Sequence, residues 1–432
     1  MTQPLTTPNT SAPPMAPVLL VNFIGTLGYT IAIPFLVFLV TRLGGDAVIY
    51  GVVAACYSTF QFFGAPILGR WSDRYGRRKI LLLSQLGTLI SWLIFGAALY
   101  LPTTELASIG AGTLTLPLVV IMFARALDGL TGGNISVANA YVADISTDAT
   151  RSRNFGRMGV ASNLGMVLGP ALAGVLGSTA MGEALPIFGA ALIALVGAGF
   201  ILFWLPESRK PVDDECKQQR LDAVQALGQE TLDCLQARKR QSTLSLLKRG
   251  PIAFVIALNF IVMAGFSFFY TAFPMNASTR LGWSAGEMGA FFAVLSFMLV
   301  VVQGPVLAWL STRTSERTLI TSGLMLLAVN FGLMQSPETW VLYIAAALFA
   351  LGNGIMWPSL VSTVAAAAGD ELQGAVQGLA GSAGSLASIF GLLLGGVAYT
   401  SMGPMTFNIS AGLMLLAFYI NLVLPKMLLR RG

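Results

Sequence analysis

Long apolar runs separated by short polar loops dominate this 432-residue chain. The runs are continuous rather than alternating, and most have about twenty residues, the length a helix needs to cross a bilayer. The pattern predicts an all-α membrane protein with twelve transmembrane helices. The predicted spans are 16–40, 48–69, 80–101, 116–142, 154–176, 185–205, 251–274, 284–309, 318–336, 339–363, 374–399 and 405–425.

A long polar interruption divides the twelve spans into two sets of six. It carries charges of both signs and has apolar residues at roughly helical spacing, which predicts a partly helical linker at the membrane surface. A regulatory domain is the alternative, but about 40 residues are few for one. The predicted order is a tail over 1–15, a six-helix bundle over 16–205, the linker over 206–250, a second six-helix bundle over 251–425, and a tail over 426–432.

The two halves also repeat each other weakly. Aligning the loop at 69–79 with 308–318 pairs Arg78 with Arg317. Aligning span five with span eleven pairs Gly156, Gly159, Gly169 and Gly174 with Gly378, Gly381, Gly391 and Gly396. A parallel repeat of this kind predicts two pseudo-symmetric bundles, with a substrate path between them near the middle of the bilayer.

Composition and charge agree with a membrane protein. Charged residues make up 10% of the chain and hydrophobic residues 55%, whereas about a quarter of a soluble domain is charged. The net charge of +6 would suggest nucleic acid in a soluble protein, but here the basic residues lie in short loops between spans. We therefore expect the lipid bilayer as a partner and no nucleic acid.

The distribution of basic residues predicts the orientation. With the N-terminus inside, the inner loops and C-terminal tail hold 22 Lys and Arg residues, and the outer loops hold only Arg42 and Arg280. Basic residues are retained on the cytoplasmic side, so both termini are expected there, in an inner or plasma membrane. Residues 1–15 contain no Lys or Arg and are interpreted as a tail rather than a signal peptide.

No enzyme, metal or cofactor chemistry is expected. The chain has no histidine, no nucleotide-binding loop, and three cysteines without metal-ligand spacing: Cys56, Cys216 and Cys234. Any proton chemistry must therefore use carboxylates.

The loop between spans two and three combines glycines, an acid and several basic residues. Glycines allow close approach of the chain, an acid can meet a helix N-terminus, and arginines can pair with acids or with the last carbonyls of a helix. Asp144, at the inner end of span four, is the expected partner of Arg77. The alternative is that these charges only set the topology. The residues of interest are Gly69, Asp73, Arg74, Gly76, Arg77, Arg78 and Asp144.

Span four carries two opposite charges, Arg125 and Asp128, three residues apart. That spacing puts them on nearly the same helical face. An arginine inside a span is costly unless it is paired or functional. Two interpretations stay open: Asp128 carries the proton and Arg125 gates it, or the two form a static ion pair.

Span five is rich in small residues. They allow close helix packing, and a proline in the middle frees a backbone carbonyl. The residues of interest are Gly156, Gly165, Gly169, Pro170 and Gly174.

Together these motifs resemble the major facilitator superfamily, and more narrowly its twelve-span drug/proton antiporters of the tetracycline-exporter type. The resemblance implies that the residues of interest at 69–78, with Asp144, form a latch that holds one conformation on the cytoplasmic side. It also implies that span five is the antiporter helix, which favours export by exchange. It also implies a monomer. The chain departs from tetracycline exporters in having no carboxylate in span one and no histidine, so neither tetracycline nor that proton route is expected.

Amides, hydroxyls and rings remain in the spans as candidates for the substrate cavity. They suit an amphipathic, neutral or weakly charged small molecule. For each residue alone, a bond across a helix interface or a ring facing lipid is the alternative. The candidates are Asn22, Thr26, Tyr29, Asn134, Asn163, Asn259, Phe266, Asn353 and Trp357.

The expected function is proton-coupled export of small amphipathic compounds by alternating access. A nutrient or metabolite importer on the same fold is the first alternative, although such carriers usually present more polar groups in the cavity. A receptor or scaffold that transports nothing is the second, but it has no need for a charged pair inside a span.

Overall fold

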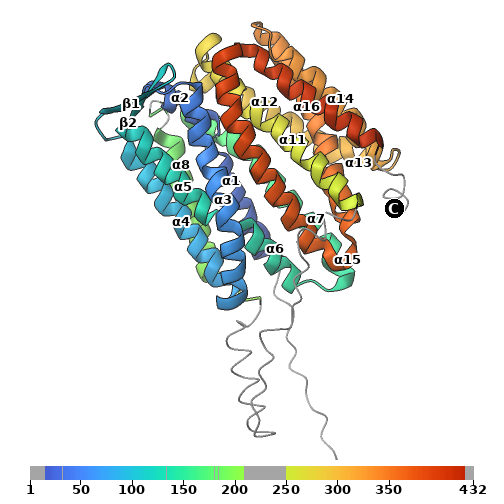
Figure 1. Cartoon of the computed structure of the whole chain (residues 1–432). Helices are drawn as coiled ribbons and strands as arrows, with labels where there is room; N and C mark the ends of the chain where they lie inside the picture. The colour runs from blue at the N-terminus through green and yellow to red at the C-terminus, as the bar shows by residue number, and fades with distance from the viewer. Residues whose placement is uncertain are drawn as a thin grey trace, which may run out of the picture.

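The computed structural model of the chain describes residues 15–31, 33–132, 134–179, 181–182, 184–208 and 250–423 (Figure 1). The predicted tails over 1–15 and 426–432, and the predicted linker over 206–250, lie outside the described residues except at their edges. In the first half the elements are α1 (Met15–Thr30), α2 (Ile33–Arg42), α3 (Ala47–Tyr75), α4 (Arg77–Ala98), β1 (Glu105–Ile109), β2 (Gly112–Thr115), α5 (Leu116–Thr131), α6 (Asn134–Asp144), α7 (Asp148–Gly177) and α8 (Ala184–Phe203). In the second half they are α11 (Gly250–Met275), η2 (Asn276–Arg280), α12 (Ala285–Val301), η3 (Val302–Val306), α13 (Leu307–Ser311), α14 (Glu316–Leu333), α15 (Thr339–Met402), η4 (Gly403–Met405) and α16 (Thr406–Val423).

The helices agree with the predicted all-α membrane fold. In the part of the chain that the structure describes, ten helical segments are long and apolar enough to cross a membrane. The last of them, Val376–Leu422, contains two of the predicted spans, and α14 occupies the position of another. The predicted spans are thus all helical.

Helix α15 contains two spans that fold back on each other. Its assignment runs without a break from Thr339 to Met402. On a straight helix Phe349 and Leu392 would lie about 65 Å apart at 1.5 Å per residue. Yet the Phe349 ring lies 5.5 Å from that of Phe269 on α11, and the Leu392 carbonyl accepts a hydrogen bond from Thr271, half a turn further along α11. The chain therefore reverses direction between the two segments.

Two predicted spans are interrupted at a residue that explains the break, and span eight contains the π-helical turn η3 between α12 and α13. Span one divides into α1 and α2, and Pro34 is the second residue of α2, a position where its missing N–H costs nothing. Span four divides into α5 and α6 after Gly132, since glycine is a poor helix former. A short antiparallel hairpin, β1–β2, joins α4 to α5 and was not predicted.

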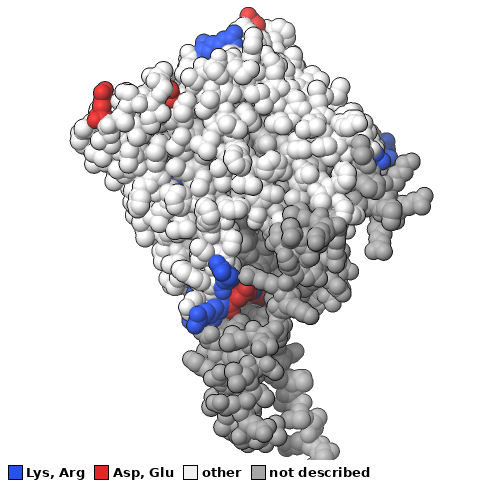
Figure 2. Space-filling model, viewed as in Figure 1, with Lys and Arg blue, Asp and Glu red and all other residues white. Residues whose placement is uncertain are grey.

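Each half packs mainly on itself. In the first half α1 packs against α7 and α8, and α4 packs against α5 and α8. In the second half α11 packs against α15 and α16, and α14 packs against the same two helices. Two pairs of helices, α3 with α15 and α7 with α12, make the main contacts between the halves. The lateral surface visible in Figure 2 is almost free of charge, and the charged residues lie at its two ends.

Candidate functional site

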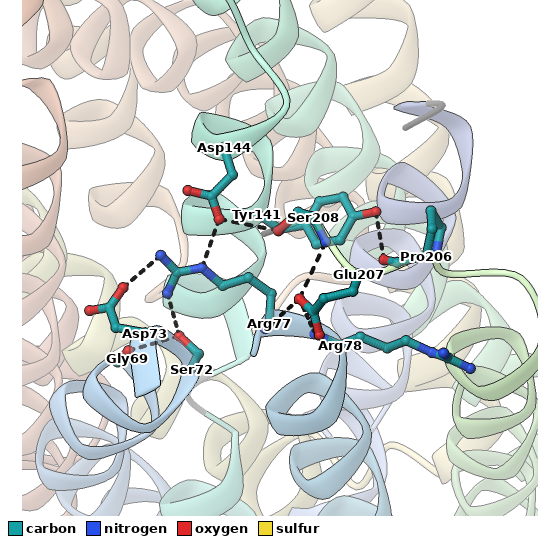
Figure 3. A network of polar contacts seen from close by, with 10 residues as sticks. All are labelled: Gly69, Ser72, Asp73, Arg77, Arg78, Tyr141, Asp144, Pro206, Glu207 and Ser208. Atoms are coloured by element: carbon teal, nitrogen blue, oxygen red, sulfur yellow. Dashed lines mark hydrogen bonds and ion pairs between the residues drawn. The ribbon is translucent and has the colours of Figure 1, made fainter. Parts of the chain in front are cut away.

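The guanidinium of Arg77 joins three helix ends (Figure 3). Its Nη2 lies 2.6 Å from Oδ1 of Asp73 at the end of α3, and its Nε donates to Oδ2 of Asp144 at the end of α6, at 2.9 Å. Its Nη1 donates to the hydroxyl of Ser72 at 2.6 Å. Arg77 itself is buried. The expected partner Asp144 is therefore in contact with it, and Ser72 and Asp73 add two contacts from α3.

Glu207 is part of the same cluster and was not among the predicted residues. Its Oε1 accepts the backbone N–H of Arg77 at 2.7 Å, and both carboxylate oxygens lie within 3.3 Å of the N–H of Arg78. These N–H groups open helix α4, where a helix lacks internal acceptors and favours negative charge. Its only signal in the sequence is an acid directly after Pro206 at the end of span six, and nothing there points to the loop between spans two and three.

Gly76 is required where Glu207 meets the loop. Its φ is +100°, a conformation that L side chains rarely adopt. A Cβ at this position would also lie 2.5 Å from Oε2 of Glu207. The predicted glycine therefore serves the turn and leaves room for the carboxylate.

Arg78 and the start of the linker connect the cluster to span six. Arg78 donates to the carbonyls of Ile201 and Leu202 at the end of α8. The hydroxyl of Tyr141 donates to the Pro206 carbonyl at 2.9 Å, and the hydroxyl of Ser208 donates to Oδ2 of Asp144 at 3.1 Å.

The other two predicted latch residues lie at the edge of the cluster. The Gly69 carbonyl accepts the hydroxyl of Ser72 at 2.7 Å, and the Arg74 guanidinium lies 5.4 Å from the centre of the Tyr75 ring. We call the residues Ser72, Asp73, Gly76, Arg77, Arg78, Asp144, Glu207 and Ser208 the Arg77 cluster.

Arg125 and Asp128 form a buried pair on α5. Nη1 of Arg125 lies 3.4 Å from Oδ2 of Asp128, and each side chain is 7% exposed. The Arg125 guanidinium lies 4.8 Å from the centre of the Tyr57 ring on α3, while its Nε has no hydrogen-bond partner among the described residues. The ion pair is therefore long, and the arginine is only partly satisfied.

Tyr57 links this pair to the predicted cavity and was missed from the sequence. Its ring stacks on that of Tyr29 with centroids 4.6 Å apart, and its hydroxyl accepts from Nε2 of Gln61 at 3.0 Å. Three helices, α1, α3 and α5, thus bring Tyr29, Tyr57 and Arg125 into one stack. Spacing along the chain carries no signal for a contact of this kind.

The small residues after Asp128 let α5 approach its neighbours. A Cβ on Gly129 would lie 2.2 Å from the Tyr57 carbonyl oxygen, so α5 crosses α3 at backbone contact. Ser84 on α4 donates to the carbonyl of Thr131, and the side chain of Thr131 fills the space beside Gly87. The close packing holds the charged pair between α3 and α4.

The predicted antiporter helix, α7, uses its glycines in different ways. Gly165 and Gly169 face α1, where a Cβ would lie 2.8 Å from the Phe23 carbonyl oxygen and 2.0 Å from the Thr30 hydroxyl oxygen, respectively. Gly174 faces Gly289 on α12, in the other half. Gly156 has no described atom within 4 Å of its Cβ position, and α7 continues through Pro170 without a break.

Two of the predicted cavity amides make equivalent contacts in the two halves. Nδ2 of Asn22 on α1 donates to the Met158 carbonyl on α7 at 3.2 Å, and Nδ2 of Asn259 on α11 donates to the Ala380 carbonyl on α15 at 3.0 Å. The repeat that pairs Gly156 with Gly378 also pairs Met158 with Ala380. Both amides therefore stabilise a helix interface, as the alternative interpretation allowed.

The remaining cavity candidates are spread over both halves. Thr26 is buried and donates to the Asn22 carbonyl at 2.9 Å, and the Phe266 ring is buried against Phe331 and Phe349. Asn353 and Trp357 lie one turn apart on α15 and are half-buried, as is Asn163 on α7. The side chain of Asn134 lies outside the described residues.

Comparison with known proteins identifies the family. The family model of the Major Facilitator Superfamily matches residues 18–392 and 255–430. The tetracycline resistance protein of class B from Escherichia coli is 27% identical over 381 residues, which cover 88% of this chain and 85% of the relative. Multidrug resistance protein 2 from Bacillus subtilis is 28% identical over 387 residues, covering 87% and 86%.

Solved structures share the fold at lower identity. The human organic anion transporter MFSD10 (TETRAN) superposes with a TM-score of 0.66 at 22% identity, covering 94% of this chain and 98% of the other. A D-xylose–proton symporter superposes with a TM-score of 0.72 at 13% identity, covering 94% and 96%. These matches cover nearly the whole length of the chain, and its helices are long and apolar enough to cross a bilayer. The chain therefore belongs to the Major Facilitator Superfamily and is a multi-pass membrane transporter.

Proposed function

We propose that this transporter exports small amphipathic organic compounds in exchange for protons. The observation that carries the proposal is the Arg125–Asp128 pair, because Asp128 is the only buried carboxylate among the described residues. The relatives named for tetracycline and multidrug resistance support export, since they match most of the chain. Proton coupling needs an acid that can lose and regain a proton inside the protein, and Asp128 is in that position.

In this proposal the two bundles over 16–205 and 251–425 alternate between an inward-open and an outward-open arrangement. Protonation of Asp128 breaks the ion pair with Arg125 and leaves the Tyr57 ring as the other contact of the guanidinium among the described residues. The freed charge shifts the position of α5 against α3. The Arg77 cluster holds the cytoplasmic ends of α3, α4 and α6 in one arrangement and releases them in the other.

The rival interpretation treats Arg125 and Asp128 as a static pair that only neutralises the arginine. A short, fully satisfied pair would favour it. The 3.4 Å separation and the unpartnered Nε of Arg125 favour a pair that changes partners during transport.

The Asp128→Asn variant tests the proposal. We expect it to lose pH-gradient-driven efflux while keeping counterflow exchange, because the amide fills the same space but cannot carry a proton. A panel of dyes and antibiotics in a pump-deficient host first identifies a transported compound. Flux of that compound is then measured in inside-out vesicles with an imposed pH gradient.

Glu338→Gln is the matched control, because Glu338 is an exposed carboxylate in the loop before α15. Undiminished gradient-driven efflux in Asp128→Asn would remove Asp128 from the mechanism. Substrate movement in the same direction as the protons would instead favour the importer alternative. We further propose that the transporter acts as a monomer in the cell membrane with both termini in the cytoplasm.

A further inference from the structure

The loop between spans eight and nine repeats the loop of the Arg77 cluster but lacks its acids. The alignment of the two loops puts Arg313 at the position of Arg74. It puts Thr312, which has no charge, at the position of Asp73. The ion pairs between described side chains all lie in the first half. The second half therefore repeats the basic residues of this loop without the carboxylates that neutralise them.

Glu316 is the acid nearest to this loop in the sequence, and its carboxylate is bonded to the neighbouring span. It begins α14 and accepts the hydroxyls of Ser362 and Thr363 on α15. Arg313 and Arg317 have no acid within ion-pair distance among the described residues. Figure 2 shows basic atoms without acidic ones beside them at the right edge, where α13 lies in Figure 1. This end of the second half thus keeps an excess of positive charge.

Arg313 is stacked on an exposed tryptophan. Its guanidinium lies 4.3 Å from the centre of the Trp309 ring, one turn earlier, and both side chains are exposed. Tryptophan and arginine at the end of a span are typical of the level where lipid headgroups meet hydrocarbon. Stacking uses the face of the guanidinium and leaves the N–H groups at its edge to donate to an acceptor. No described acceptor takes them.

The surface that leads to Trp309 along span eight is apolar. Phe297 and Val301 on α12 and Pro305 in η3 are exposed, and they precede Trp309 at intervals of four residues. On a regular α-helix such a series turns by about 40° at each step. The wider turn of the π-helix η3 offsets part of that rotation. An acyl chain can therefore lie along this face while its headgroup lies at Arg313.

We propose that Arg313 and Trp309 form a binding site for the headgroup of an anionic phospholipid, with Arg317 adding to its positive charge. The bilayer then supplies the negative charge that the first half supplies from its own acids. The predicted orientation puts the site in the cytoplasmic leaflet, whose anionic lipids attract basic residues near the surface. The proposal is independent of the transported compound and of the proton site.

Native mass spectrometry of the full chain in a delipidating detergent tests the proposal. Phosphatidylglycerol and phosphatidylcholine with the same acyl chains are the two probes. We expect the first phosphatidylglycerol to bind more tightly than the first phosphatidylcholine. Arg313→Gln should weaken phosphatidylglycerol binding by about fivefold, the effect of one basic residue near an anionic surface, and leave phosphatidylcholine unchanged. Arg313→Lys should keep most of the preference, because the charge remains.

Arg280→Gln is the matched control, because Arg280 is an exposed arginine at the opposite end of the second half and donates to a backbone carbonyl. Equal phosphatidylglycerol affinity in the Arg313→Gln and Arg280→Gln proteins would overturn the proposal. An equal loss for both lipids would also overturn it, since that pattern marks a packing effect. Displacement of the lipid by an equal concentration of inorganic phosphate would assign the site to a free anion instead.

A label beside the site tests the protein with Arg313 in place. A bimane fluorophore is attached at Thr312→Cys, an exposed position, in a background with the native cysteines replaced. In liposomes, nitroxide-labelled phosphatidylglycerol should quench it more than nitroxide-labelled phosphatidylcholine at equal mole fraction, and high salt should reduce the difference. A label at Glu338→Cys, exposed at the opposite end, should show no preference. Equal quenching by the two lipids at Thr312→Cys would contradict the site.

Discussion

Glu207 occupies the place in the Arg77 cluster where backbone N–H groups have no helical acceptor. Its carboxylate takes the first N–H groups of α4 and adds negative charge at the positive end of that helix. Asp144 has a different task, because it accepts from the Arg77 side chain and from Ser208. One acid therefore holds the start of α4, and the other holds the arginine.

We predict that Glu207→Ala lowers the unfolding free energy by about 1–2 kcal/mol, the size of a lost helix cap plus a charge at a helix end. Thermal unfolding in detergent measures the change as a lower Tm. Glu105→Ala is the control, since Glu105 is exposed on β1. An unchanged Tm in Glu207→Ala would show that water replaces the carboxylate at no cost.

At the scale of single residues the sequence predicted the Arg77–Asp144 contact but not Glu207 or Tyr57. Asp144 could be found because an acid at the inner end of a span faces the basic loop on the same side of the membrane. Glu207 reaches a helix start 130 positions away, and Tyr57 depends on how α1, α3 and α5 cross. Such contacts arise from the packing of whole helices, which no local pattern encodes.

The helices that cross the bilayer were predicted well, and the elements outside it were predicted poorly. Apolar runs long enough to span a bilayer must be helical, so the spans follow from length and hydropathy. Pro34 is a sequence signal for the break between α1 and α2, but whether a proline breaks a helix depends on the local geometry. The hairpin β1–β2 lies outside the spans, where neither hydropathy nor a helical period applies.

Asp46 ties this hairpin to helix α3. Its Oδ1 accepts the N–H of Ile49 at 3.0 Å as the N-cap of α3, and its Oδ2 accepts the N–H of Ala111 in the hairpin turn at 3.2 Å. Gly112 also needs the space beside Asp46, since a Cβ there would lie 2.7 Å from the Asp46 backbone N.

We predict that Asp46→Ala lowers the unfolding free energy by about 1 kcal/mol through the lost cap and makes the hairpin more sensitive to protease. Limited proteolysis of purified protein, with cleavage mapped by mass spectrometry, checks the second effect. Glu338→Ala is the matched control, because Glu338 is an N-cap residue whose side chain makes no capping bond. Equal cleavage rates in both variants would argue against a role for Asp46 in holding the hairpin.

At the scale of the whole molecule the distribution of charge predicts how the chain sits in the membrane. The Arg77 cluster lies at one end, and the 22-to-2 excess of basic residues predicts that this end faces the cytoplasm. The hairpin β1–β2, at the end of α4 opposite Arg77, is then expected on the outer side.

We predict that reporter fusions at the C-terminus and in the 209–249 segment are active only for a cytoplasmic reporter. Fusions after Thr104, in the loop that carries the hairpin, should be active only for an exported one. Alkaline phosphatase and green fluorescent protein serve as the paired reporters. The reverse pattern would invert the molecule and place the Arg77 cluster on the outer face.

The two halves make equivalent helix contacts but differ in the side chains that they bury. All the buried charges among the described residues, Arg77, Arg125 and Asp128, lie in the first half. The second half instead has a continuous aromatic core, with the rings of Phe269, Phe273, Phe291, Phe331 and Phe349 in mutual contact. Because the buried charges lie in the first half, we expect random mutagenesis for altered pH dependence to gather its hits there.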